Sequence, residues 1–559
     1  MLAPILLAGA VAAQAQAQAI ERHLPATPKG AGAALVEPNA LPGDQDATPI
    51  GPSLRAIVLL GPTEAAHVAA TDGLTVGDLA RLRAGQEAVS ALMGPFFGQP
   101  MSRKLIGEIE AALAGRYRHL RYPFVSFSTP EQEIGGGVLQ IRVIEFVAGE
   151  VTVRGARSDS EAAALRARIL LQGGTPIDAR ELSQDLDSLN RYPFREVQAV
   201  FSPGAQLGVS NLALMVQNER PWQAYAGYGN DGSPSTSLGR YFLGGSIGGV
   251  LGRDSVLSTQ VTASQDWFAG RKDPDYQGAA LNYVLPIGRR GQIEASADVV
   301  ETHQSLAPFA VRMQAVQSGL GYRATVGDWF GGQAASDVRF GVEAKRQVAS
   351  TYFSGVDVYG VAMNVYQLYA GYHRTGRDAL GVSNLDLTMR VSPGGLDAAS
   401  SDARAVLFSQ GRMKRADYGY LSLDYNHITP LRFDMALNTQ LIGQYASNAL
   451  PRTEQAGLGG KPLVRGYTLD DGAFDSVLIL RNELHFPKSA LSPYLFVDAG
   501  QGRDNAARTT SALYSSGIGA QLRLTRHLMI DIDAARAFNE SRDGQTGDWR
   551  IHTNLTVAF

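Results

Sequence analysis

The chain ends with the stretch Trp549-Arg-Ile-His-Thr-Asn-Leu-Thr-Val-Ala-Phe559. Successive side chains of a β-strand point to opposite faces, so this stretch would have two faces of different character. The first face carries Trp549, Ile551, Thr553, Leu555, Val557 and Phe559, and the second carries Arg550, His552, Asn554 and Thr556. A strand with one lipid-facing and one lumen-facing side is typical of a transmembrane β-barrel. The stretch therefore predicts a barrel whose last strand closes on an aromatic residue.

The same alternation recurs after Pro221, in segments of roughly ten residues separated by turn residues. Clear examples are Ile293 to Val299, Phe433 to Leu441 and Leu528 to Ala534. Together such segments predict a membrane β-barrel of about 16 antiparallel strands over residues 221–559. The long polar segments 393–415 and 446–474 are predicted to be extracellular loops, whereas a short turn such as 428–430 would be periplasmic.

Composition narrows the possible function classes. The 559 residues include no cysteine, which excludes disulfides, thiolate metal sites and cysteine nucleophiles. A formal net charge of -3 provides no basic field, so we expect no nucleic-acid partner. No segment approaches the ~18 uninterrupted apolar residues of a spanning helix. A chain that crosses a membrane without such a helix must form a closed barrel, because only closure pairs every backbone amide in lipid.

The N-terminus is predicted to be an export signal over residues 1–19. An apolar run from Leu2 to Ala13 is followed by the Ala-x-Ala cleavage site Ala17-Gln18-Ala19, although the usual basic start is missing. Residues 20–52 carry six prolines with several glycines and alanines, which is typical of a linker. This linker has room for at most a short plug segment, since Ile20 to Leu24 is the only candidate before the first proline.

Between the linker and the barrel we predict two small α/β modules, residues 53–146 and 147–220, each in the order β-α-α-β-β. In the first module, apolar residues recur every four positions after Ser102 and predict one face of a helix. They are Leu105, Ile109, Leu113 and Tyr117. Two strands are predicted to follow, Phe124 to Ser128 and Val138 to Ile144. The alternative is a pair of unrelated α/β domains.

Two motifs near the C-terminus carry the strongest functional signal. Leu463-Val464-Arg465-Gly466-Tyr467 lies in the 446–474 loop, and Phe496-Val497-Asp498-Ala499-Gly500 lies in the second strand after it. Alternation along that strand turns Phe496 and Asp498 toward the lumen. Arg465 can reach Asp498 only if the loop folds back into the barrel, where a guanidinium can make two parallel hydrogen bonds to a carboxylate. The alternative is that both residues are merely solvated.

The paired Val-Arg-Gly-Tyr and Phe-x-Asp-x-Gly motifs resemble those of the outer-membrane superfamily that includes the BamA insertase and the two-partner-secretion transporters (TpsB). The resemblance implies that the loop residue Arg465 bonds the strand residue Asp498. The other residues of the implied loop-to-barrel motif are Val464, Gly466, Tyr467, Phe496 and Gly500. Strings such as Tyr122-Pro-Phe-Val125 and Leu189-Asn-Arg-Tyr-Pro193 resemble haemolysin-activator POTRA (polypeptide-transport-associated) domains, so the two modules are expected to be tandem POTRA domains.

The resemblance to haemolysin-activator and filamentous-haemagglutinin transporters implies a bacterial outer-membrane protein with its POTRA domains in the periplasm. It implies export of one unfolded exoprotein (TpsA type) through the barrel, after capture by strand addition at a sheet edge. The expected capture site pairs the Phe124 to Ser128 strand with a groove along the preceding helix. Its residues are Leu105, Ile109, Phe124, Val125 and Phe127. The expected partners are the exoprotein and outer-membrane lipid, and we expect a monomer; the alternative function is a BamA-like barrel-assembly insertase.

No enzyme chemistry is expected. The string Gly227-Tyr-Gly-Asn-Asp-Gly232 fits a dinucleotide-binding pattern but ends a predicted barrel strand and opens no helix. The string Gly244-Gly-Ser-Ile-Gly248 fits a nucleophile elbow but lies inside a predicted strand. The nine histidines lack metal-ligand spacing, so we expect no catalytic residue, no metal site and no cofactor. A passive porin is a further alternative, which would require neither the α/β modules nor an inward arginine loop.

Overall fold

The computed structural model describes residues 34–35, 44–66, 71–327, 335–486, 490–542 and 544–559. The chain divides into two compact units, one of Lys29–Glu219 and one that contains Arg220–Phe559. The predicted signal peptide, residues 1–19, and most of the predicted linker, residues 20–52, lie outside the described residues. Within the described ranges, no helix has both the length and the apolar character that a membrane span requires.

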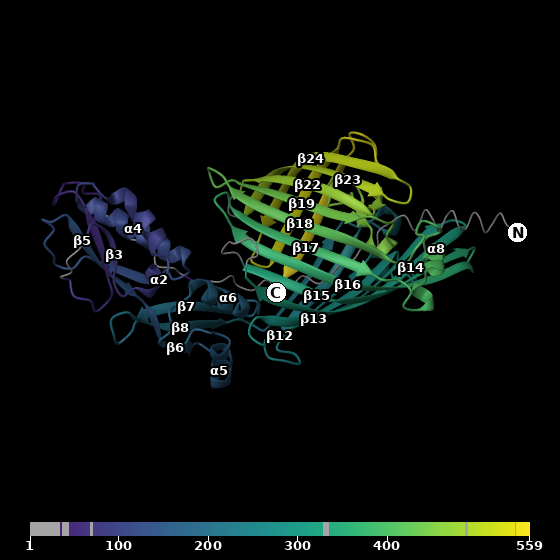
Figure 1. The fold of residues 1–559 in the computed structure, drawn as a ribbon. Helices are drawn as coiled ribbons and strands as arrows, with labels where there is room; N and C mark the ends of the chain where they lie inside the picture. The colour runs from purple at the N-terminus through teal and green to yellow at the C-terminus, as the bar shows by residue number, and fades with distance from the viewer. Residues whose placement is uncertain (1–33, 36–43, 67–70, 328–334, 487–489, 543) are drawn as a thin grey trace. The chain divides into compact units, whose positions relative to one another are not determined.

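The first α/β module of the Lys29–Glu219 unit has a four-stranded sheet in the order β3-β2-β5-β4. Figure 1 labels its strands β3 and β5 and its helices α2 and α4. Its elements are β2 (Ala56–Leu60), β3 (Gly73–Val76), α2 (Ala80–Arg83), α3 (Gln86–Met93), the 3-10 turn η1 (Gly94–Phe96), α4 (Arg103–His119), β4 (Val125–Ser128) and β5 (Val138–Glu145). The sequence pattern did not predict β3, because four residues are too few to show a strand alternation. Strand β4 lies at one edge of the sheet and β3 at the other.

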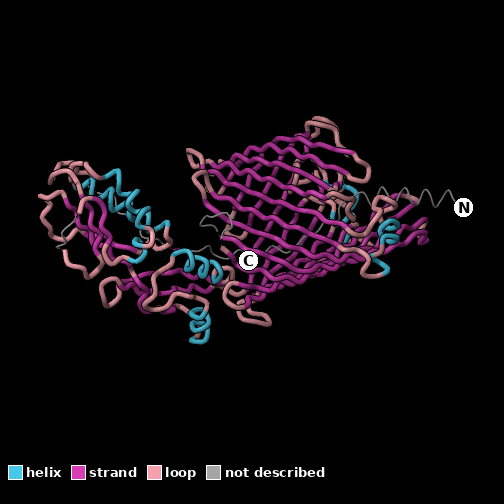
Figure 2. The backbone as a smooth tube through the Cα atoms, viewed as in Figure 1, coloured by secondary structure: helices cyan, strands magenta, loops and turns pink. Residues whose placement is uncertain are grey.

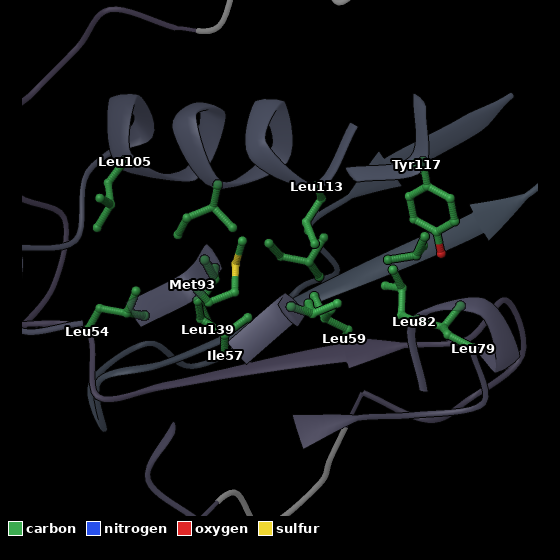
Figure 3. Close-up of a cluster of buried hydrophobic side chains, with 14 of the residues drawn as sticks. Leu54, Ile57, Leu59, Leu79, Leu82, Met93, Leu105, Leu113, Tyr117 and Leu139 are labelled. Carbon is green, nitrogen blue, oxygen red and sulfur yellow. The ribbon is translucent and has the colours of Figure 1, made fainter. Parts of the chain in front are cut away.

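The core of this module lies between α4 and the sheet (Figure 3). Helix α4 begins after Ser102, whose side chain accepts a hydrogen bond from Leu105 N and caps the helix. The four apolar residues of its predicted face are all buried. At the end of that face, the Tyr117 hydroxyl donates to Glu145 Oε1 at 2.7 Å and ties α4 to β5. Burial raises the pKa of Tyr117, and the bond to Glu145 adds to this shift, so the hydroxyl stays protonated and remains a donor.

The second module follows directly and has the predicted order β-α-α-β-β. Its elements are β6 (Val147–Arg154), α5 (Asp159–Ala167), α6 (Ala179–Leu189), β7 (Arg195–Pro203) and β8 (Val209–Asn218). The short strand β1 (Ala34–Leu35) pairs in parallel with β7, which gives the sheet order β1-β7-β8-β6. Ser158 and Asp178 cap α5 and α6 by accepting hydrogen bonds from backbone amides of their first turns. The two helices pack their apolar faces onto the sheet and form a separate core.

Residues after Arg220 form a closed barrel of 16 strands, each antiparallel to its neighbours (Figures 1 and 2). The strands are β9 (Trp222–Gly229), β10 (Arg240–Gly248), β11 (Val256–Ala263), β12 (Tyr276–Ile287), β13 (Gly291–Leu306), β14 (Phe309–Val326), β15 (Ala335–Phe353), β16 (Val356–Arg377), β17 (Val382–Ser392), β18 (Tyr418–Pro430), β19 (Ala436–Ala446), β22 (Ser476–His485), β23 (Leu491–Asp504), β24 (Thr509–Arg523), β25 (Leu528–Ala537) and β26 (Trp549–Ala558). Strand β26 pairs with β9 and closes the barrel. The predicted strand number and fold class are therefore confirmed.

Alternation along the strands separates an outer from an inner face. In β26, Trp549 and Ile551 are 64% and 61% exposed, whereas His552 between Ile551 and Thr553 is 3% exposed. In β23, Leu495 and Val497 are half-exposed, whereas Phe496 and Asp498 are buried. The exposed set is apolar and faces outward, and the buried set faces the lumen. This is the pattern that a lipid-facing barrel requires, because lipid offers no partner for a polar group.

Two predicted strand ends are wrong. Phe433 was expected to begin a strand, but it lies in the turn before β19 and has a backbone φ of 61°. Residues 428–430 were expected to form a turn, but they continue β18 and pair with the start of β19. An apolar residue in a turn extends the apparent alternation by a few positions, so the pattern misplaces the strand end.

Candidate functional site

The loop between β19 and β22, residues 447–475, folds back inside the barrel; we refer to it as the inserted loop. It contains the 3-10 turns η4 (Arg452–Glu454) and η5 (Leu469–Asp471) and the two-residue strands β20 (Ala456–Gly457) and β21 (Ala473–Phe474), which pair with each other. Its central residues Val464, Arg465 and Tyr467 are at most 1% exposed, although they belong to a connection between strands. Contacts with inward-facing barrel residues account for this burial.

Arg465 and Asp498 make a two-pronged ion pair inside the barrel. The Arg465 Nε donates to Asp498 Oδ2 and its Nη2 donates to Asp498 Oδ1, each at 2.7 Å. The backbone N–H of Arg465 donates to Asp498 Oδ2 as well, at 3.2 Å. Parallel bonds between a guanidinium and a carboxylate fix orientation as well as distance. The structure thus joins two residues that lie 33 positions apart in the chain.

Two further carboxylates and an aromatic ring surround the same guanidinium. Arg465 Nη1 donates to Glu483 Oε1 at 2.8 Å and lies 3.4 Å from Asp533 Oδ1. The Arg465 Cζ lies 3.6 Å from the centroid of the Phe496 ring, a distance that suits a cation–π contact. We refer to Arg465, Glu483, Asp498 and Asp533 together as the Arg465 anchor. Its acids come from β22, β23 and β25, so the arginine ties one loop to three strands.

Further cations limit the negative charge that the anchor would otherwise concentrate. Lys461 Nζ lies 2.7 Å from Asp531 and 3.9 Å from Asp533. Arg481 Nη2 lies 3.4 Å from Glu483 Oε1, and its Nη1 donates to the backbone oxygen of Pro462 in the loop. Buried charges are tolerated when they are paired and hydrogen-bonded. The site is therefore a network of matched charges rather than one isolated pair.

The residues beside Arg465 fit the loop to the barrel wall. Gly466 has a φ of 87°, which disfavours a side chain, and its N–H donates to His552 Nε2 at 3.2 Å. The Tyr467 hydroxyl donates to Tyr514 O at 2.9 Å and also lies 2.7 Å from Asn539 Oδ1. These contacts extend the attachment of the loop to β24, β26 and the segment after β25.

Val464 and Gly500 meet at a position where only glycine fits. A Cβ atom placed on Gly500 would lie 2.7 Å from Val464 Cγ2 and 2.9 Å from Leu458 Cδ1. Those two loop side chains are buried with Tyr467, Ile479, Leu513 and Ala537 in one cluster. All seven predicted loop-to-barrel residues, Val464, Arg465, Gly466, Tyr467, Phe496, Asp498 and Gly500, therefore lie at one contact between loop and wall.

Two glycines of β24 complete this contact and were not predicted. A Cβ atom on Gly517 would lie 2.5 Å from Phe496 Cζ, and one on Gly519 would lie 2.2 Å from Tyr494 Cζ. The missing side chains leave room for the rings of Tyr494 and Phe496 on the neighbouring strand. The signal in the sequence is the spacing of two glycines by two positions, which puts both on the same face of a strand.

A second polar attachment of the inserted loop was also not predicted. Glu454 Oε1 accepts a hydrogen bond from Lys345 Nζ at 2.6 Å, and Glu454 Oε2 accepts from Gln367 Nε2 and the Tyr420 hydroxyl, each at 2.8 Å. We refer to Glu454, Lys345, Gln367 and Tyr420 together as the Glu454 anchor. Its wall residues belong to β15, β16 and β18, none of which contributes to the Arg465 anchor.

The predicted groove in the first α/β module is wrong in three of its residues. Leu105 and Ile109 are 3% and 0% exposed and face the core of the module, so they line no open groove. Phe124 precedes β4 and packs into the core of the second module, with its ring centroid 4.4 Å from that of Phe201. The period of an apolar helix face shows burial but does not distinguish a groove wall from a core, and Phe124 is apolar because it joins two modules.

The edge strand itself is present. Strand β4 pairs with β5 from Val125 with Glu145 to Ser128 with Arg142. Phe124 O accepts a bond from Phe146 N, so in the alternating ladder Ser126 and Ser128 point their backbone groups at β5. The backbone groups of Val125 and Phe127 therefore point to the open side. Val125 N–H donates locally to Pro123 O at 3.0 Å, which leaves the Phe127 N–H as the outward donor in the middle of the edge.

Comparison with known proteins identifies the family. The sequence model of the family described as haemolysin secretion/activation protein ShlB/FhaC/HecB matches residues 208–522, which is more than half of the chain. The chain belongs to this family. It is therefore a two-partner-secretion transporter of the outer membrane, with its POTRA domains in the periplasm, and the insertase alternative is set aside. The family is one of transporters rather than enzymes.

Individual ShlB-family relatives agree with this assignment. The chain is 25% identical over 395 residues to the hemolysin transporter protein ShlB of Serratia marcescens, covering 67% of each chain. It is 22% identical over 404 residues to the hemolysin transporter protein HpmB of Proteus mirabilis, covering 69% of each. Its fold is similar to that of CdiB from Escherichia coli, with a TM-score of 0.69, 18% identity and 93% of each chain covered. Within the described part of this ShlB-family chain, no cluster of three or more His, Asp or Glu side chains suits a metal ion.

Proposed function

We propose that this transporter acts as a monomer. It captures one unfolded secreted exoprotein at the β4 edge of its first POTRA domain and passes that exoprotein through the barrel lumen. The inserted loop occupies part of that lumen and moves aside during passage. The observation that carries the proposal is the attachment of the loop. A connection between two barrel strands is held inside by exchangeable polar contacts, the Arg465 and Glu454 anchors.

The edge of the first POTRA domain supports the capture step. An exposed strand edge offers unpaired backbone donors and acceptors, and an extended chain can add to it as a further strand. Such binding uses hydrogen bonds to the substrate backbone, so it suits an unfolded substrate of varied sequence. Strand β4 has this geometry, and the half-exposed side chains of Val125 and Phe127 lie beside the open backbone groups. The relatives ShlB and HpmB are named hemolysin transporters, which supports a secreted protein as the cargo.

The lumen supports the passage step. Barrels of 16 strands are wide enough to leave an aqueous channel, so an extended chain fits once the loop is displaced. Water and a polar chain can replace the hydrogen bonds that hold the loop. No nucleotide site is required, and folding of the exoprotein outside the cell would supply the driving force.

The capture step is tested by proline substitution of Phe127. Proline removes the outward N–H and clashes with an added strand, so we expect secretion of the partner exoprotein to fall. The matched control is Leu74→Pro in β3, the opposite edge, where Gly73 N and Gly77 N bond β2 and alternate residues point outward. Both variants are compared at equal outer-membrane abundance. Equal losses, or unchanged secretion with Phe127→Pro, would refute capture at β4.

A further inference from the structure

We propose that Glu454 is a positioning residue that holds the first limb of the inserted loop, residues 447–457, independently of the Arg465 anchor. The two anchors would then be separate attachments of the inserted loop, and release of one would leave the other docked. The inference rests on the proposed function for the role of the loop in export. The attachment of the loop does not depend on that function.

The contacts of Glu454 are more complete than those of an incidental surface acid. Both carboxylate oxygens have two partners: Lys345 Nζ and Thr453 Oγ1 on Oε1 at 2.6 and 3.1 Å, and Gln367 Nε2 and the Tyr420 hydroxyl on Oε2 at 2.8 Å each. The backbone oxygen of Glu454 accepts a further bond from Gln444 Nε2 at 2.9 Å. One loop residue is thereby fixed to four of the five wall strands from β15 to β19, namely β15, β16, β18 and β19.

Glu454 and Lys345 are both buried, so bulk water neutralises neither charge. Glu454 is 4% exposed and Lys345 is 6% exposed, and such a charge pair is retained only when each partner neutralises the other. Lys345 also lies 3.5 Å from Glu343, which pairs with Arg390 on β17, on the far side of β16. The wall therefore presents a prepared cation at the position where the loop places its acid.

The two anchors use different parts of the barrel. The Glu454 anchor draws on β15, β16 and β18, with Gln444 of β19 added through the Glu454 backbone, and the Arg465 anchor draws on β22, β23 and β25. Eleven positions of loop chain separate Glu454 from Arg465. No residue is shared between the two sets, so the loss of one set removes no bond from the other. The proposal therefore requires that each anchor can be released while the other stays formed.

Spin labels test the independence of the two limbs. The chain has no cysteine, so a single cysteine at Ala456 reports the first limb and one at Pro462 reports the tip near Arg465. Each label is read by electron paramagnetic resonance in the full chain in liposomes. With Glu454→Gln, we expect the Ala456 label to shift from an immobile to a mobile spectrum while the Pro462 label is unchanged. With Arg465→Gln, we expect the reverse.

A matched control separates the loop contact from a general change of wall charge. Glu343→Gln removes one carboxylate that also neighbours Lys345 but belongs to the wall, and it should leave both labels immobile. If Glu454→Gln fails to assemble, as judged by loss of heat-modifiable migration, Tyr420→Phe removes one bond of the anchor and should mobilise the Ala456 label to a smaller extent.

Two results would overturn the inference: an unchanged Ala456 label with either variant of the Glu454 anchor, or equal mobilisation of both labels. No substrate takes part in this measurement. A failure here would therefore remove the Glu454 anchor as a support of the loop without testing capture or export, which secretion of the exoprotein tests separately.

Discussion

Arg465 and Asp498 face each other with their planar groups aligned, joined by two hydrogen bonds of 2.7 Å inside a closed barrel. Their side chains are 1% and 0% exposed. Because neither side chain has access to bulk water, each charge is neutralised by its partner and by the surrounding charged side chains. The pair therefore joins the inserted loop to the barrel wall.

Charge reversal of this pair should show coupling. Either Arg465→Asp or Asp498→Arg alone places like charges together, and breaking a buried pair costs about 3–5 kcal/mol. The double exchange restores opposite charges without the original geometry, so we expect partial recovery. Secreted exoprotein is measured for the wild type, both single variants and the double variant at matched abundance. Strictly additive losses would mean that the two residues act separately.

Substitution of Gly500 should displace the loop through packing alone. In Gly500→Ala the new methyl group meets Val464 Cγ2 at 2.7 Å, and overpacking of this kind costs about 1–3 kcal/mol. The control is Gly443→Ala in β19, where the nearest atom would lie at 3.6 Å, an ordinary contact. The midpoint temperature of thermal unfolding, followed by heat-modifiable migration of the barrel, should drop for Gly500→Ala and stay near the wild-type value for Gly443→Ala. Equal midpoints for the two variants would contradict the close contact.

Channel recordings should reveal the inserted loop. A lumen of 16 strands can hold an aqueous channel, but the loop fills part of it. Single-channel conductance of the full-length chain in planar bilayers should therefore be small and flickering. Arg465→Gln should raise both the conductance and the open time, since it loosens one anchor. A large, steady conductance from the unmodified chain would count against an inserted loop.

The burial of Ile109 in the core of the first POTRA domain can be tested. Ile109 is fully buried, so Ile109→Ala should destabilise the domain by about 2–5 kcal/mol through the cavity it leaves. Limited proteolysis of the periplasmic region in the intact protein should then become faster, whereas Ser128→Ala, at an exposed position of β4, should leave it unchanged. Normal protease resistance combined with lost substrate capture would instead restore Ile109 to a groove.

Local patterns in the sequence predict the barrel and the motif strand well. In β23 every second residue faces lipid, so a period of two places Asp498 inside without any knowledge of its partner. The family resemblance then supplies Arg465. Both inferences use short stretches of sequence: the alternation around Asp498 predicts that it faces the lumen, and the Val-Arg-Gly-Tyr motif marks Arg465.

Contacts between distant segments are not visible in this way. Glu454 and Lys345 are 109 positions apart, and neither lies in a pattern that marks it as buried and paired. Phe124 has the same limitation on a smaller scale: its apolar character is clear, but its contact with Phe201 depends on how the second module packs against it. Buried polar partners and contacts between modules are properties of the folded chain, which short-range periodicity does not encode.

For the proposed export, the inserted loop must leave the barrel wall. A Cβ atom on Gly466 would lie 3.4 Å from Ala535 Cβ, close to the separation in a disulfide, and the chain offers no competing cysteine. The double variant Gly466→Cys with Ala535→Cys would tether the loop to β25 under oxidising conditions, with each single cysteine variant as a control.

Secretion of the partner exoprotein is then measured for the same double variant before and after reduction, with the disulfide quantified in each state. Any strain from cysteine at Gly466 is common to both states. We predict that secretion stops when the disulfide is formed and returns when it is reduced. Continued secretion by fully cross-linked protein would contradict the account.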